Sequence, residues 1–146
     1  MLAKVPSLIT PALYQMIYNA GHGSTIVIVD AFFPAHSQSL PVVEVPNVDI
    51  ATILDVLLPY CPPDHVGGAP FYMMAVDGTA KPSPEIMARY QAAIDRHWSG
   101  CEIAPMPRFD FYTHTKNSFG IIKTTDETAW ANISMRIGVP GARASR

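Results

Sequence analysis

Apolar side chains first recur with helical spacing near the start of the chain. Thr10 is suited to cap a helix there and Pro11 to hold its first position, where the missing proline N–H is not needed. The apolar face of this helix consists of Leu13, Met16, Ile17 and Ala20. Gly21 is expected to end it, since glycine readily closes a helix C-terminus. The pattern therefore predicts a first amphipathic helix over residues 11–20.

Continuous apolar runs further along predict buried strands. Residues 25–30 form a β-branched run that is too apolar to alternate, which is typical of a strand covered on both faces. Residues 71–76 form a second apolar run of this kind. Shorter strands are predicted near residues 101–104, 119–123 and 132–137.

Three more helices are predicted among these strands. One covers residues 49–58, and another has Ser83 as its cap, Pro84 in its first turn and Gly100 at its end. A last helix is expected over about residues 108–117. The alternation predicts an α/β layered fold with a largely parallel sheet flanked by helices, and ligands in such folds gather beyond the carboxyl ends of the strands.

Composition narrows the classes of protein to consider. The chain has 146 residues, of which 49% are hydrophobic, so a single domain over residues 1–146 is expected. Only 15% of residues are charged, the formal net charge is -2, and no basic run could follow a phosphate backbone, so no nucleic-acid partner is expected. The sequence has neither a secretory leader nor the roughly 20 apolar residues of a membrane span, which predicts a cytoplasmic protein without membrane contact.

Cofactor and metal motifs are missing from the sequence. There is no glycine-rich phosphate-binding motif, so no nucleotide cofactor is expected. The five histidines include no H-E-x-x-H pair, and Cys61 and Cys101 lack ligand spacing, so no metal site is expected and both thiols are read as free.

His22 is the first candidate for proton chemistry. It lies between Gly21 and Gly23, which leave the imidazole approachable, and an imidazole can donate or accept a proton near neutral pH. The alternative is a structural histidine at a helix C-terminus, where the helix dipole alone favours it.

Asp30 ends the first strand and opens a loop that contains His36. The carboxylate and this second imidazole could face the same pocket as His22, where a carboxylate would suit a pair of sugar hydroxyls. Alternatively, Asp30 satisfies loop amides and His36 lies on the surface.

Two further groups of side chains suit ligand binding. Arg108 and Tyr112 lie four residues apart and would share one helix face, or they are a helix-start cation and a core tyrosine. Trp130, Ala131 and Asn132 offer an aromatic plane, close backbone approach and an amide, or they form a turn with a packed indole.

These fragments together resemble the D-ribose pyranase and L-fucose mutarotase family nearly from end to end. The order and spacing of five segments carry the resemblance: residues 21–23, 30–37, 73–78, 108–112 and 130–133. Residues 33–37 are more similar to the L-fucose branch than to the D-ribose branch.

The resemblance implies an isomerase that works without a cofactor and interconverts the anomers and ring forms of a free monosaccharide, L-fucose or a related aldose. It implies that His22 is the catalytic proton donor, and that Asp30, Arg108 and residues 130–132 contact the sugar. His36 and Tyr112 are added as further sugar-contacting candidates. The family also forms ring-like homo-oligomers, commonly decamers of two pentameric rings, with sites at subunit contacts.

Trp130 departs from the family, which usually has tyrosine at this position. An indole cannot titrate, so Tyr112, His36 or a water would supply the second proton-transfer group, or the protein is slower or prefers another sugar. Phe32 stands where fucose-type relatives often carry a polar residue, so the pocket is more apolar; with Phe33 and Met74 it could face a 6-deoxy methyl group.

The alternatives to this function are D-ribose pyranase activity, a non-catalytic monosaccharide-binding or sugar-transport-associated protein, and a structural module.

Overall fold

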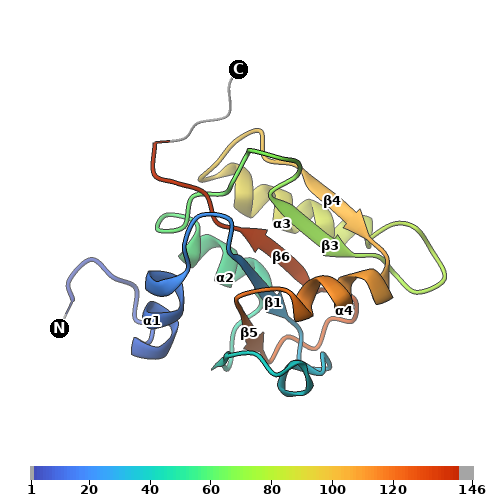
Figure 1. Ribbon diagram of the computed structural model, residues 1–146, viewed down its shortest axis with the longest axis horizontal. Helices are drawn as coiled ribbons and strands as arrows, with labels where there is room; N and C mark the ends of the chain where they lie inside the picture. Colours follow the sequence, from blue (N-terminus) through green and yellow to red (C-terminus); the bar gives the residue numbers. More distant parts are fainter. Residues whose placement is uncertain (1, 142–146) are drawn as a thin grey trace.

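A six-stranded mixed sheet forms the centre of the computed structural model, which describes residues 2–141 (Figure 1). The strands are β1 (Thr25–Val29), β2 (Val42–Val45), β3 (Phe71–Met74), β4 (Ile103–Met106), β5 (Gly120–Thr124) and β6 (Ile133–Arg136). Their order is β2-β5-β1-β6-β3-β4, and β6 runs antiparallel to both of its neighbours while the other pairs are parallel. The predicted α/β fold with a largely parallel sheet is confirmed.

The helices begin largely where the caps predict. They are α1 (Pro11–Asn19), α2 (Ile50–Leu57), α3 (Pro84–Asp95) and α4 (Arg108–Lys116), with a short 3-10 turn η1 (Ala35–Gln38). Thr10 accepts the Leu13 N–H at 3.2 Å, and Asp49 accepts the Thr52 N–H at 2.7 Å. Among residues 2–141, none of the helices combines the length and apolar character that a membrane span needs.

Local structure differs from the sequence pattern at three places. The Ser83 side chain makes no capping hydrogen bond, and α3 ends at Asp95 rather than Gly100. It ends early because the chain turns there, and Trp98 donates its indole N–H to the Leu58 carbonyl at 2.8 Å. β2, an edge strand of four residues with Glu44 exposed, was not among the predicted strands.

Helices cover both faces of the sheet, which explains why β1 does not alternate. Ile26 and Ile28 pack with α1, α2 and α3 on one face. Val27 and Val29 pack on the other face with Phe111 of α4 and with the loop that follows β1. In Figure 1, α4 lies on the side of the sheet opposite α2 and α3. A strand between two apolar layers needs apolar residues at every position.

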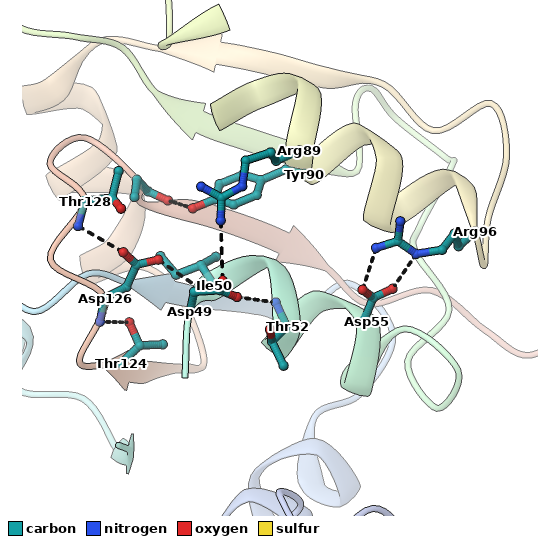
Figure 2. A network of polar contacts seen from close by, with 11 residues as sticks. Asp49, Ile50, Thr52, Asp55, Arg89, Tyr90, Arg96, Thr124, Asp126 and Thr128 are labelled. Carbon is teal, nitrogen blue, oxygen red and sulfur yellow. Dashed lines mark hydrogen bonds and ion pairs between the residues drawn. The ribbon is translucent and has the colours of Figure 1, made fainter. Parts of the chain in front are cut away.

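The segment between β5 and β6 is held from the α2 and α3 side (Figure 2). Asp126 accepts the Ile50 N–H at the start of α2 at 3.1 Å, and its carbonyl accepts the Ala31 N–H at 2.8 Å. Tyr90 of α3 is fully buried and donates its hydroxyl to the Ala131 carbonyl at 2.8 Å. Burial raises the pKa of Tyr90, so the phenol stays a donor. These bonds fix the backbone just before β6.

Tyr90→Phe is expected to lower the free energy of unfolding by about 1–3 kcal/mol, because it leaves a buried carbonyl without its donor. Urea denaturation measures the loss. Tyr60→Phe is the matched control, since the Tyr60 hydroxyl also donates to a backbone carbonyl, that of Lys4 at 3.0 Å, but at an exposed site. The control should change stability by less than about 0.5 kcal/mol. Equal losses in the two variants would contradict this account.

Candidate functional site

A pocket opens at the carboxyl end of β1. Its lining comes from the loop after β1, the end of β3, the start of α4 and the segment before β6: Asp30, Phe32, Phe33, Met74, Arg108, Tyr112, Ala129, Trp130 and Asn132. Its volume of about 160 Å³ lies below the roughly 300–1,000 Å³ of pockets for drug-sized ligands. The pocket therefore suits a small ligand.

Arg108 is the cation of the pocket, and aromatic rings surround it. Its guanidinium carbon lies 5.4, 5.6 and 5.5 Å from the ring centroids of Phe109, Tyr112 and Trp130. Its Nε donates to the Tyr112 hydroxyl at 3.2 Å, and Nη1 donates to Asp77 Oδ2 at 3.3 Å. The hydrogen bond to Tyr112 raises the pKa of Arg108, which stays charged. The predicted pairing of Arg108 and Tyr112 on one helix face is confirmed.

Asp30 supplies a buried carboxyl group next to Asn132. The Asp30 N–H donates to Asn132 Oδ1 at 2.8 Å, and Asp30 Oδ1 accepts the Phe32 N–H at 3.0 Å. Burial raises the pKa of Asp30, and the N–H of Phe32 opposes this shift. Asn132 Nδ2 contacts only the weak acceptor Met74 Sδ, at 3.7 Å, among the described residues, so it can donate to a ligand.

Trp130 has a strained backbone. Its φ of 61° lies in the left-handed region, which residues other than glycine rarely adopt. The next residue, Ala131, is fully buried and is the one whose carbonyl Tyr90 holds. This conformation places the indole over Arg108. The sequence pattern does not predict it.

His22 lies at the other end of β1, in the loop that follows α1. β1 has five residues, which at about 3.3 Å per residue puts roughly 16 Å of strand between His22 and Asp30. Instead, His22 Nε2 lies 3.5 Å from Asp64 Oδ2. The expectation that His22 and Asp30 share a pocket is therefore wrong within one chain, because the two residues lie at opposite ends of β1.

His36 also lies away from the pocket. It belongs to η1, its side chain is exposed, and its Nε2 is 3.0 Å from Glu44 Oε1. The turn through η1 directs this imidazole toward β2, so the expected placement beside Asp30 is wrong. The other histidines have different neighbours: His65 lies near Cys101, His97 near Asp55 and His114 near Ser134. No histidine of the described chain lines the pocket.

Two carboxylates that contact arginines are paired with residues distant in the sequence. Asp77 and Asp64 reach their arginines, Arg108 and Arg136, across 31 and 72 residues of chain. Within residues 2–141, no group of three or more His, Cys, Asp or Glu side chains is arranged to hold a metal ion.

Nearly the whole chain is similar to a known protein family and to solved structures. Residues 3–140 match the RbsD / FucU transport protein family. The fucose mutarotase from Streptococcus pneumoniae, solved with L-fucose, is 30% identical with a TM-score of 0.85, and the match covers 94% of this chain and 99% of that one. FucU from Bifidobacterium longum is 30% identical with a TM-score of 0.84, covering 92% of this chain and 97% of that one.

A more distant match shows the fold alone. Bacillus subtilis RbsD, solved with D-ribose, is 19% identical with a TM-score of 0.68, and the match covers 90% of this chain and 94% of that one. The family match spans nearly the whole chain, as the resemblance of its motifs predicts. This chain therefore belongs to the RbsD / FucU family.

Proposed function

We propose that this protein is an isomerase that interconverts the anomers and ring forms of a free monosaccharide, L-fucose or a related aldose. One observation carries the proposal: a carboxyl group, a guanidinium, a phenol and an amide meet in one small pocket beside an apolar wall. A similar protein, the mutarotase from Streptococcus pneumoniae, was solved with L-fucose. The polar groups suit sugar hydroxyls, and Phe32, Phe33 and Met74 suit a 6-deoxy methyl group.

The reaction needs two proton transfers and no change of oxidation state. A base removes the proton from the anomeric hydroxyl, the C1–O5 bond breaks as the aldehyde forms, and an acid delivers a proton to O5. The aldehyde then turns about C1–C2, and the same steps run in reverse to close the ring on its other face. Each proton taken up is returned, so positioned acid and base groups are sufficient.

His22 is the proposed proton donor, and it would come from a second copy of the chain. Within one chain it lies at the opposite end of β1 from the pocket. Large apolar side chains are exposed near both ends: Phe32 at 67% and Phe109 at 71% beside the pocket, and Val66 at 72% beside Asp64. Phe32 and Phe109 border the same pocket, and neighbouring exposed apolar side chains are one mark of a surface that another subunit covers. A ring-like homo-oligomer would bring the two ends together.

Tyr112 is the proposed second proton-transfer group. With His22 as the acid, the Tyr112 oxygen, which Arg108 Nε contacts at 3.2 Å, would be the base that takes the anomeric proton and returns it when the ring closes. His36 is turned toward Glu44, and the indole of Trp130 cannot titrate. Of the side chains first considered for this role, Tyr112 therefore fits best.

Catalytic amounts of the protein are expected to speed exchange between the α and β anomer signals of L-fucose in saturation-transfer NMR. His22→Ala should lower the exchange rate about 10²–10⁴-fold, the usual contribution of a positioned acid or base. His36→Ala is the matched control and should keep the rate, because this exposed imidazole pairs with Glu44. The proposal fails if no aldose of a panel that includes L-fucose and D-ribose is accelerated, or if folded His22→Ala keeps full activity.

A second function is a non-catalytic role in sugar binding or transport. The matching family is described as a transport protein family, and Trp130 offers no titratable group. Calorimetric binding of an aldose without anomer exchange would favour this role over the isomerase.

Tyr112→Phe is expected to lower the exchange rate by at least about 10²-fold while the calorimetric affinity for the sugar changes little, because the ring remains and only the hydroxyl is lost. Adding Trp130→Tyr to Tyr112→Phe should restore part of the rate, since it returns a phenol to the pocket. An unchanged rate in Tyr112→Phe would assign the second transfer to water. A lost affinity with an unchanged turnover would make Tyr112 a binding group only.

A further inference from the structure

A second polar cluster lies at the end of β1 opposite the pocket. The proposed chemistry leaves most of this cluster unexplained. Asp64 Oδ2 is 3.0 Å from Arg136 Nε and 3.5 Å from His22 Nε2, and Asp64 Oδ1 accepts the Val66 N–H at 2.9 Å. The Asp64 side chain is only 9% exposed, whereas that of His22 is 56% exposed. A buried anion therefore stands beneath an accessible imidazole.

Arg136 holds the loop that carries Asp64. Its Nη2 donates to the carbonyls of Asp64, Val66 and Gly68 at 3.2, 2.7 and 3.4 Å. Arg136 is the last residue of β6, and its own carbonyl accepts the Asp64 N–H at 2.9 Å. The position of the Asp64 carboxylate is thus set by the central sheet.

The loop that carries His22 is tied to the same strand end. Gly23 N–H donates to the Ile137 carbonyl at 2.8 Å, and Ile137 N–H donates to the Ser24 carbonyl at 2.8 Å. Gly138, the next residue, leaves no room for a side chain, since a Cβ there would lie 2.7 Å from the Pro63 carbonyl oxygen. The His22 loop and the Asp64 loop are therefore fixed to each other through residues 136–138.

Asp64 stays ionised in this setting. The Val66 N–H lowers the pKa of Asp64 most, and Arg136 lowers it further. The charged groups that face Asp64 are Arg136 from β6 and His22 from the loop before β1. A carboxylate beside one ring nitrogen of a histidine fixes the orientation and tautomer of the ring, and leaves the other nitrogen to react.

We propose that Asp64, held by Arg136, is a positioning residue for His22: it accepts from Nε2–H, so that in the protonated ring Nδ1–H faces outward and delivers its proton to a sugar bound in the pocket of a second copy. The inference rests on the proposed role of His22 as proton donor. Asp64 itself does not touch the sugar, because it lies at the sheet edge away from the pocket of its own chain and beneath the imidazole.

Asp64→Asn tests this role with little change of shape: the amide oxygen can still accept the Val66 N–H, while the amide nitrogen in place of Oδ2 no longer accepts from His22 Nε2 or from Arg136 Nε. Anomer exchange should fall about 10–100-fold, the range found when a group that orients a metal-binding histidine is removed, while calorimetric sugar affinity stays the same. In ¹⁵N NMR, His22 of the unaltered chain should carry its proton on Nε2, and this preference should be lost in Asp64→Asn. Asp64→Glu should recover part of the exchange rate.

Asp55→Asn is the matched control. Asp55 of α2 also contacts an arginine and a histidine, Arg96 (Figure 2) and His97 at the end of α3, and it neither lines the pocket nor contacts His22 among the described residues. It should leave exchange unchanged. The proposal is overturned if Asp64→Asn keeps the full exchange rate, or if the Nε2 preference of His22 survives in it. If the unaltered chain shows no exchange, the proposed function fails, and the ¹⁵N spectra still decide whether Asp64 orients the ring.

Discussion

β6 runs antiparallel to β1, with Ile133 opposite Ile28 and Arg136 opposite Thr25, and the positions of the polar side chains follow from this pairing. At one sheet edge it sets Asn132 beside Asp30 and completes the pocket. At the other edge it sets Arg136 beside the loops of Asp64 and His22. A slip of one residue would turn every side chain of β6 to the other face. The same register therefore builds both polar clusters.

The pocket depends on buried bonds as much as on its own side chains. Tyr90 and Asp126 fix the segment before β6 from the α2 and α3 side of the sheet. This support holds Trp130 in a backbone conformation that it would otherwise avoid, and the indole in turn covers Arg108. A guanidinium held by rings and a carboxylate loses little freedom when a ligand binds, which favours affinity for a small polar molecule.

Hydrophobic periodicity and caps predicted α1, α2 and β1, because these elements carry their signals within a few residues. The edge strand β2 and the end of α3 depend on neighbours distant in sequence, so the local pattern failed there. In the pocket, the spacing of Arg108 and Tyr112 predicted their contact. The contacts of Asp64 with Arg136 and of Asp77 with Arg108 could not be predicted, because the two residues of each pair are far apart in the sequence. The joint placement of His22, Asp30 and His36 was wrong, because the length of β1 separates His22 from Asp30 and the η1 turn directs His36 toward Glu44 of β2.

If the pocket of one copy works with His22 of another, mixing a His22 variant with a pocket variant tests it most directly. His22→Ala keeps an intact pocket, while Asp30→Asn, which is expected to weaken sugar binding by removing the pocket's carboxyl group, keeps an intact imidazole. When the two chains are unfolded together and refolded as one assembly, about a quarter of the sites should combine both intact parts, and anomer exchange should return in NMR to about that fraction of the unaltered rate. No recovery in a mixture that assembles normally would show that His22 and Asp30 do not act across a subunit contact.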